Sequence, residues 1–417
     1  MARPLERSPL APEMPAPPAA VAGARFATTA AGIRYAGRID LLLIEAAPGS
    51  TIAGVFTRSL TPGHPVLWCR RALATGLEHG GNARAVLVNA GNANVCRGAE
   101  GDAAVAREVA AVQAALGCAA HEVLVASTGV IGERLAVERI ESAIPELVAG
   151  LRADGIETAA RAIMTTDTFP KWATATATLG GREVIITGIA KGSGMIAPDM
   201  ATMLAFVLTD AAIPAPLLQI LLGRATDRSF NATTVDGDTS TSDTLLLLAT
   251  GRAGNAPPQD ADDPALAGFA DALDRVLIDL AQQVVRDGEG AQKFIEIAIA
   301  GAADDAAARR IGLTVANSPL VKTAIAGADA NWGRIVMAVG KAGEAMDPAR
   351  LKVAFGGHDV ARSGAAVPEL DEAPVAAHLA GREIRIDIEV GGGPGRATVW
   401  TCDLTHGYID INADYRS

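Results

Sequence analysis

The chain has 417 residues, of which 49% are hydrophobic and 20% charged, enough apolar material for two or three domains with real cores. The formal net charge is −11, and the sequence contains no block of like-charged residues. Both observations argue against nucleic acid or an anionic membrane surface as a partner. No apolar run reaches the roughly 18 residues that a membrane span requires.

The cysteines and histidines give no sign of a disulfide framework or a metal site. The 4 cysteines include no CxxC pair, and the 6 histidines lack the spacing of metal ligands. We therefore expect reduced thiols in a cytoplasmic protein that works without a metal or other cofactor.

The composition of the N-terminus differs from that of the rest of the chain. Residues 1–24 are rich in proline and alanine, and the prolines interrupt any apolar run of the kind that a signal peptide shows. We predict a disordered leader over residues 1–24. A main α/β domain is expected over residues 25–315 and a smaller α/β domain over residues 316–417.

Strand-like and helical periodicities alternate along the chain and predict a mixed α/β (α+β) fold. Strands are expected at residues 39–46, 51–56, 84–89, 122–127, 171–179, 182–190, 204–208, 244–249, 294–300, 351–355, 382–390 and 396–404. Helices are expected at residues 102–116, 137–151, 155–164, 214–229, 267–286 and 318–341. The GGGPG sequence at 391–395 suits a hairpin between the last two strands.

A Thr-Gly pair, Thr128 and Gly129, follows the strand predicted at 122–127. At the end of a strand, such a pair can direct a hydroxyl and a backbone N–H toward one point, as an oxyanion hole requires. On its own the pair is a weak signal, because such a pair more often belongs to an ordinary loop.

Three other polar segments have two interpretations each. The hydroxyls of TTDTFPK at 165–171 could line a pocket or only cap a turn. Glu289 stands between two glycines, where backbones can approach closely, although a glutamate in a loop is usually solvated. The acidic stretch at 236–243 lacks the ligand spacing of an EF-hand, so we interpret it as a turn.

The segment at 191–205, KGSGMIAPDMATMLA, carries the most chemistry. One interpretation is a loop that leads into a core strand, with the Thr202 hydroxyl bonded to backbone. The other is self-cleavage, in which this hydroxyl attacks the Ala201 carbonyl and Thr202 becomes a new N-terminus. A free α-amine titrates near pH 8 and can act as the base for its own hydroxyl.

This segment resembles the self-cleavage segment of the ornithine acetyltransferase family, the bifunctional arginine-biosynthesis proteins. The resemblance extends from about residue 25 to the last residue. It includes AGIRYAGRIDL at 31–41, NAGNAN at 89–94, STGVIG at 127–132, TTDTFPK at 165–171, DGEGA at 287–291, GADANWGRI at 327–335 and the tail at 408–417.

The resemblance implies a layered sandwich of sheets and helices around the cleavage site between Ala201 and Thr202. It makes Thr202 the nucleophile and gives the oxyanion hole to Thr128 and Gly129. The implied substrate-binding residues are Thr165 or Thr166 (the register is open), Lys191, Thr202, Glu289, Asn412 and Ser417. The chain ends in Ser417 where some relatives have threonine, and either residue supplies a hydroxyl.

The expected reaction is transfer of the acetyl group of N2-acetyl-L-ornithine to L-glutamate through an acetyl-Thr202 intermediate. We assign Lys191 to the substrate carboxylate and Glu289 to the ornithine ammonium by complementary charge. The two chains made by cleavage are expected to assemble as an α2β2 heterotetramer. Whether acetyl-CoA serves as a second acetyl donor stays open.

Two alternatives remain. The first is an N-terminal-nucleophile aminopeptidase or other hydrolase, in which water replaces glutamate; the tail at 412–417 and the DGEG segment favour the transferase. The second is a non-enzymatic binding or assembly protein, which absence of self-cleavage would support.

Overall fold

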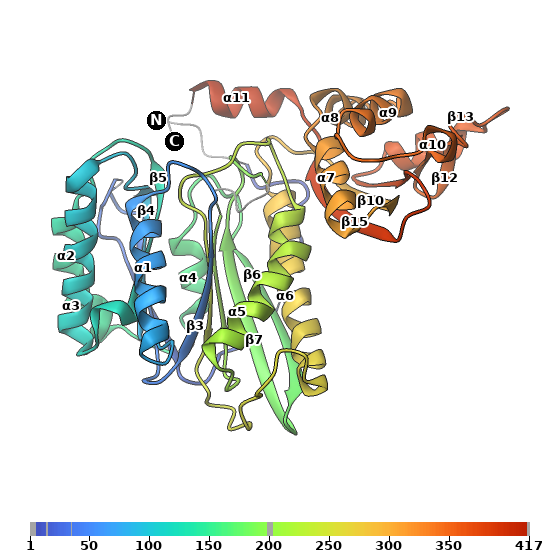
Figure 1. Ribbon diagram of the computed structural model, residues 1–417. Helices are drawn as coiled ribbons and strands as arrows, with labels where there is room; N and C mark the ends of the chain where they lie inside the picture. Colours follow the sequence, from blue (N-terminus) through green and yellow to red (C-terminus); the bar gives the residue numbers. More distant parts are fainter. Residues whose placement is uncertain (1–5, 14–15, 35, 198–202, 415–417) are drawn as a thin grey trace.

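The computed structural model describes residues 6–13, 16–34, 36–197 and 203–414 (Figure 1). The fold is mixed α/β, as predicted. Its main part contains two sheets that lie face to face.

The first sheet has four strands in the order β1 (Ala24–Thr29), β2 (Leu41–Ala46), β4 (Ala85–Asn92) and β5 (Val123–Val130). Within it only β4 and β5 are parallel. The second sheet has five strands in the order β3 (Thr51–Phe56), β9 (Thr244–Ala249), β8 (Leu204–Thr209), β7 (Arg182–Lys191) and β6 (Lys171–Leu179), and only β8 and β9 are parallel.

Alternation along the strands divides the apolar side chains between two cores. In β8, Leu204, Phe206 and Leu208 join the core between the two sheets, whereas Ala205 and Val207 join the core on the other face. Strands buried on both faces read as continuous apolar runs, which explains why these segments were recognisable from sequence.

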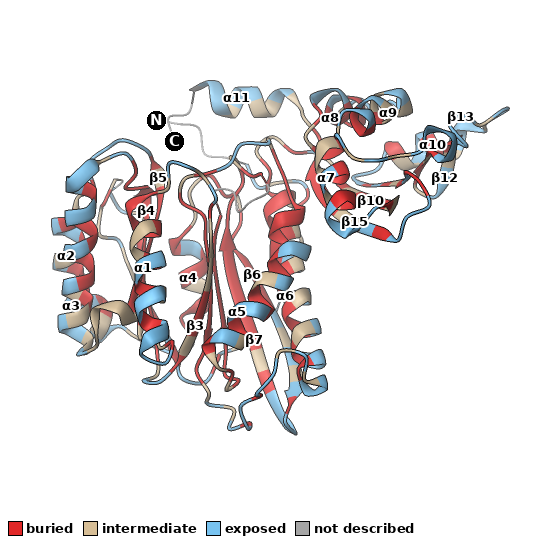
Figure 2. Ribbon diagram, viewed as in Figure 1, coloured by how far each residue is buried: buried red, intermediate tan, exposed pale blue. Residues whose placement is uncertain are grey.

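Helices cover the outer faces of both sheets (Figure 1). Helices α2 (Gly98–Leu116) and α3 (Val137–Ala149) pack on the four-stranded sheet, and α5 (Ala215–Arg228) and α6 (Ala267–Arg286) on the five-stranded sheet. Helix α1 (His64–Glu78) contacts β5 and β3, and α4 (Ile156–Ala162) contacts β1 and β7. Figure 2 shows buried residues concentrated on the strands and exposed ones on the outward faces of these helices. This arrangement is the layered sandwich that the resemblance implied.

The C-terminal part forms a smaller unit around a six-stranded sheet. The strand order is β13 (Ala365–Ala366), β12 (His358–Arg362), β11 (Lys352–Phe355), β14 (Glu383–Glu389), β10 (Phe294–Ala302) and β15 (Gly395–Cys402). The helices of this unit are α7 (Asp305–Ala316), α8 (Pro319–Ala326), α9 (Trp332–Gly340) and α10 (Glu372–Leu379). Short 3-10 helices lie at Ala120–Glu122, Phe230–Ala232, Pro264–Leu266 and Pro348–Arg350.

The hydrophobic core of this unit begins at Ile295 in β10, which pairs with both β14 and β15. The predicted boundary after residue 315 therefore falls inside the unit, near the end of α7. The predicted boundary was too late in the chain. Strand β10 follows α6 closely in sequence, but it pairs only with strands that come later and so belongs to the C-terminal unit.

The predicted hairpin between the last two strands is wrong. Strands β14 and β15 do not pair with each other; β10 lies between them, parallel to β14 and antiparallel to β15. The glycine-rich connection passes close to the backbone of β10, where a Cβ on Gly393 would lie 2.0 Å from the Ala302 carbonyl oxygen. The glycines thus permit a close crossing.

The prediction of a disordered leader also needs correction for residues 6–13 and 16–23. Leu10 and Val21 are buried, and Trp172 Nε1 donates a hydrogen bond of 3.0 Å to the carbonyl of Ala16. The backbone N–H of Ser8 donates to Thr168 Oγ1 at 2.9 Å. The prolines interrupt the periodicity by which a helix or strand is recognised in a sequence, but they do not prevent the apolar side chains of this segment from being buried.

The last helix, α11 (His406–Asp414), lies above the strand ends of the main part (Figure 1). Among the described residues, no helix has both the length and the apolar character that crossing a membrane would require.

Candidate active site

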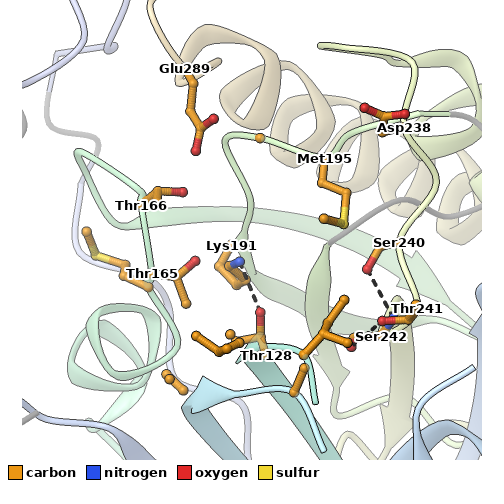
Figure 3. Close-up of a pocket in the computed structure, with 18 of the residues that line it drawn as sticks. Thr128, Thr165, Thr166, Lys191, Met195, Asp238, Ser240, Thr241, Ser242 and Glu289 are labelled. Carbon is orange, nitrogen blue, oxygen red and sulfur yellow. Dashed lines mark hydrogen bonds between the residues drawn. The ribbon is translucent and has the colours of Figure 1, made fainter. Parts of the chain in front are cut away.

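A cavity of about 380 Å³ lies where strands of both sheets end (Figure 3). The described residues that were predicted for the site all line it: Thr128, Gly129, Thr165, Thr166, Lys191, Glu289 and Asn412. The predicted nucleophile Thr202, its neighbour Ala201 and the tail residue Ser417 lie outside the described residues.

Thr128 and Gly129 occupy the end of β5, beside Ala90 and Gly91 of β4. Gly129 has φ = +130°, and a Cβ there would lie 2.3 Å from the carbonyl carbon of Gly91. No other residue fits this position, so the close approach of β4 and β5 fixes the backbone beside Thr128.

The Thr128 hydroxyl is oriented by a lysine. Thr128 is 1% exposed, and its Oγ1 accepts a hydrogen bond of 3.2 Å from Nζ of Lys191. Because a hydroxyl has one hydrogen to donate, a lone pair occupied by Lys191 leaves that hydrogen for a group in the cavity. The arrangement suits a donor to a developing oxyanion.

Lys191 is the last residue of β7 and pairs with Leu204, the first residue of β8. The strand pair thus brings this buried ammonium beside the start of β8. Burial lowers the pKa of Lys191, an effect that Asp167 opposes. A bound carboxylate would favour the charged form of the lysine.

On the opposite wall, Glu289 is held by its own loop and by the C-terminal helix. Its backbone N–H donates to the carbonyl of Ser193 at 3.0 Å, and Asn412 Nδ2 donates to its Oε2 at 2.8 Å. Burial raises the pKa of Glu289, although the hydrogen bond from Asn412 acts in the other direction. A Cβ at Gly194 would lie 2.4 Å from Oε2, so this glycine makes room for the carboxylate.

Both candidate threonines of the segment 165–171 line the cavity, so the register stays open. Thr166 shares a hydrogen bond of 2.6 Å with the hydroxyl of Ser193, and the backbone N–H of Thr165 donates to Asp167.

Two aspartates of the predicted turn at 236–243 hold the chain on either side of the predicted cleavage site between Ala201 and Thr202. The Asp236 carboxylate accepts hydrogen bonds from the backbone of Met195 at 2.6 Å and of Ile196 at 2.9 Å. Asp243 accepts one from Met203, the residue that follows Thr202, at 2.9 Å. The stretch at 236–243 is visibly rich in Asp, Ser and Thr, but nothing in the neighbouring sequence indicates that its aspartates bind the backbone on both sides of residues 198–202.

Residues from this stretch also line the cavity, together with a cation and an aspartate from an earlier segment. They are Asp236, Asp238, Thr239, Ser240, Thr241, Ser242, Arg38 and Asp40. The Arg38 guanidinium is bonded to the carbonyls of Met164 and Thr165. Sequence reasoning missed all eight as cavity residues, because their side chains meet the site only through long-range packing.

A family model described as the ArgJ family matches residues 25–417. The chain belongs to the ArgJ family. It is 56% identical over 417 residues to the arginine biosynthesis bifunctional protein ArgJ of Gluconobacter oxydans (strain 621H), with 100% of this chain and 97% of the relative covered. The relative of the same name from Rhizobium meliloti (strain 1021) is 54% identical over 413 residues, which cover 98% of this chain and 99% of that protein.

Solved structures of ArgJ relatives match parts of the chain. The arginine biosynthesis bifunctional protein argJ from Bacillus halodurans is 40% identical, covers 50% of this chain and 98% of its own, and has a TM-score of 0.49. Ornithine acetyltransferase from Mycobacterium tuberculosis, complexed with ornithine, is 37% identical with a TM-score of 0.37, and covers 43% of this chain and 92% of its own. The predicted family is confirmed, and the chain is an acyltransferase of arginine biosynthesis.

Proposed function

We propose that this ArgJ family member transfers the acetyl group of N2-acetyl-L-ornithine to L-glutamate through an acetyl-Thr202 intermediate. The observation that carries the proposal is the single cavity that joins Thr128, Gly129, Lys191 and Glu289 beside the start of β8. Cleavage between Ala201 and Thr202 creates the nucleophile. In this account the enzyme acts in the cytoplasm, without a metal or cofactor, as an α2β2 heterotetramer of the two chains.

In the first half-reaction, the Thr202 α-amine accepts the proton of the Thr202 hydroxyl, and Oγ attacks the acetyl carbonyl carbon. The new C–O bond leaves a negative charge on the carbonyl oxygen, which the hydroxyl of Thr128 and the backbone N–H of Gly129 stabilise. The C–N bond then breaks, the proton moves to the departing nitrogen, and ornithine leaves.

In the second half-reaction, the glutamate amine attacks the acetyl ester. The ester C–O bond breaks, and Thr202 regains its proton. One nucleophile thus serves two amino-acid substrates in turn, which predicts ping-pong kinetics. Acetyl-CoA is a further candidate donor for the same threonine, since its thioester is also open to attack by Oγ.

The charges of the cavity suit substrates of this class. Nζ of Lys191 has one hydrogen-bond partner among the described residues and can give its other hydrogens to a carboxylate. Glu289 provides an anion for the side-chain ammonium of ornithine. In our account Thr165 or Thr166, Asn412 and Ser417 supply further polar contacts to substrate.

The deciding experiment is an assay of the purified protein with N2-acetylornithine and glutamate. We expect ornithine and N-acetylglutamate in equal amounts, and no acetylglutamate when glutamate is omitted. Free acetate as the main product in the presence of glutamate would instead support a hydrolase.

As the pH falls, the KM for acetylornithine should rise. The rise should begin at a higher pH than it would if Glu289 had the pKa of an ordinary glutamate. Because burial raises the pKa of Glu289 above its ordinary value of 4.5, the carboxylate is protonated earlier as the pH falls and no longer attracts the ammonium. The expected result is a KM for acetylornithine that rises as pH falls toward the raised pKa. Steady-state kinetics between neutral and acidic pH measure it.

The matched control is Glu289→Gln, which keeps the shape and cannot ionise. This variant should have a raised KM at neutral pH and lack the acidic rise. An acidic rise of equal size in both proteins would show that another group is responsible.

A further inference from the structure

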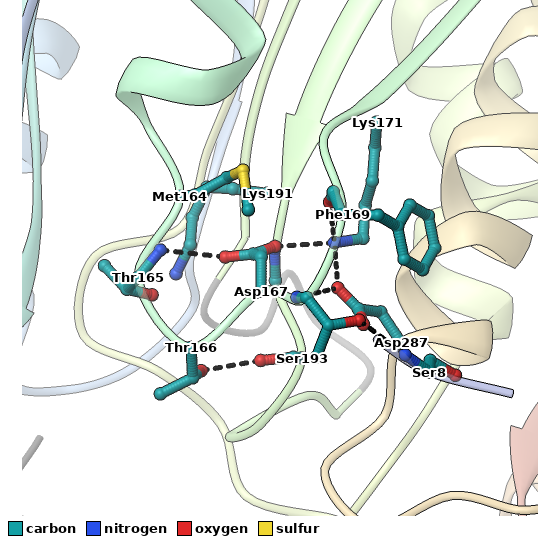
Figure 4. Close-up of polar contacts among 12 residues, drawn as sticks. Ser8, Met164, Thr165, Thr166, Asp167, Phe169, Lys171, Lys191, Ser193 and Asp287 are labelled. Carbon is teal, nitrogen blue, oxygen red and sulfur yellow. Dashed lines mark hydrogen bonds and ion pairs between the residues drawn. The ribbon is translucent and has the colours of Figure 1, made fainter. Parts of the chain in front are cut away.

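Three chain segments that carry cavity residues are tied to one another by hydrogen bonds, and Figure 4 shows the contacts around Asp167, Lys171 and Asp287. They are residues 165–168, which include both candidate threonines, residues 191–194, which begin with Lys191, and residues 287–289, which end with Glu289. Each pair of segments shares at least one hydrogen bond. The positions of the cavity side chains therefore depend on one network.

The first two segments are joined twice. The backbone N–H of Gly192 donates to Asp167 Oδ1 at 2.7 Å, and Thr166 and Ser193 share their hydroxyl bond. Ser193 is also bonded through its carbonyl to the N–H of Glu289. The third link is Asp287, whose Oδ2 accepts from the backbone N–H of Thr168 at 2.9 Å and whose Oδ1 accepts from the Thr168 hydroxyl.

Lys171 lies at the centre of these links, at the first position of β6. Its side chain is 0% exposed, and Nζ donates to Asp167 Oδ1 and Asp287 Oδ2, both at 2.6 Å, and to the carbonyl of Phe169 at 3.3 Å. An ammonium has three hydrogens, so these acceptors use all of them. Lys171 thus has no donor left for a substrate, unlike Lys191.

The charges around Lys171 are balanced within the buried network. Two aspartates, Asp167 and Asp287, face two lysines, Lys171 and Lys191. Burial works against ionisation of Asp167, but the two lysines outweigh it and hold the pKa of this carboxyl below its ordinary value. The same aspartates raise the pKa of Lys171 against the effect of its burial.

We propose that Lys171 is a positioning residue for acetyl transfer: through Asp167 and Asp287 it locks the three segments that present Thr165, Thr166, Lys191 and Glu289 to the substrate. This inference rests on the proposed function. A purely stabilising role is the alternative, but buried ion pairs often stabilise no more than apolar side chains of similar volume. Here the two ion pairs of Lys171, with Asp167 and with Asp287, join the segment at 165–168 to the segment at 287–289.

The test compares Lys171→Met, which removes the ammonium from a side chain of similar length, with the double variant Lys171→Met/Asp287→Asn. The single variant leaves one buried carboxylate uncompensated and should lower the melting temperature. The double variant restores the balance of charge and should recover most of that loss. Kinetics are measured on the cleaved fraction of each protein.

We expect the KM for acetylornithine to rise about 100-fold in Lys171→Met, because small displacements of binding groups have effects of this order. In the double variant the melting temperature recovers, whereas KM stays at least about 10-fold above wild type since the link between segments is still missing. A double variant that regains both stability and wild-type KM would overturn the proposal.

Two more variants complete the design. Leu147→Ala removes a buried apolar side chain from α3, on the outer face of the four-stranded sheet, and should lower the melting temperature without changing KM. If neither lysine variant folds, Thr168→Val removes the Thr168 hydroxyl, and with it the bond to Asp287 and the bond from the Ser8 backbone N–H. This variant should raise KM about 10-fold. An unchanged KM in Thr168→Val would contradict the proposal.

Wild-type protein is assayed in parallel. An active wild type with kinetically normal variants overturns this inference alone. A wild type that does not transfer acetyl overturns the proposed function, and the inference with it.

Discussion

A Thr202→Ala variant is expected to remain one uncut chain of 417 residues and to have no acetyl-transfer activity. Both steps of the proposal use the same hydroxyl, first against the Ala201 carbonyl and then against the acetyl group. Without Oγ no ester can form, and without cleavage no α-amine is available as base. The effect on activity should therefore be complete.

A denaturing gel and the acetylornithine assay check this expectation. Wild type should give two bands of nearly equal size, from residues 1–201 and 202–417, and the variant one band at the full length. The control is Thr202→Ser, which keeps a hydroxyl and should still cleave and transfer acetyl, though more slowly. Two bands from Thr202→Ala would place the nucleophile elsewhere.

Thr128→Ala should lower the acetyl-transfer rate by about 100- to 1,000-fold, the usual effect of losing one oxyanion donor. The structure gives the reason: Lys191 occupies a lone pair of the Thr128 hydroxyl and leaves its hydrogen for the cavity. The loss should appear in kcat more than in KM, because the oxyanion exists only in the transition state and intermediate.

The measurement is steady-state kinetics on the cleaved fraction of the variant, with Thr128→Ser as the matched control. Serine keeps the hydroxyl and should stay much closer to wild type. If Thr128→Ala kept a turnover within a few-fold of wild type, another group would have to stabilise the oxyanion.

The sequence predicted the central strands of the main part well because these strands are buried on both faces. Segments such as TLLLLA in β9 and LAFVLT in β8 are apolar on both faces, so each is recognisable in the sequence as a short continuous apolar run. Pairing was harder to predict. The connection at 391–395 has every local feature of a hairpin, yet β10 inserts between the two strands because its pairing is non-local.

In the candidate site too, some residues could be identified from the sequence, whereas other contacts became visible only in the structure. Motif resemblance identified the residues that line the cavity, and the structure brings all the described ones together. Other contacts around the site join residues that are far apart in sequence. Asp236 and Asp243 accept hydrogen bonds from the backbone of Met195 and Met203, and Lys171 pairs with Asp287. In the sequence Lys171 is one cation at the start of a strand, four residues after Asp167, and only the fold brings Asp287 to it.

In the proposed reaction, Thr202 carries the acetyl group from one substrate to the other. This role can be tested by intact-mass spectrometry of wild-type protein mixed with N2-acetylornithine alone. We predict two chains divided between Ala201 and Thr202, with the mass of one acetyl group added only to the chain that begins at Thr202. Addition of glutamate should remove that group. Active protein whose chains never gain an acetyl group, or gain it on the chain that ends at Ala201, would show that Thr202 does not carry the group.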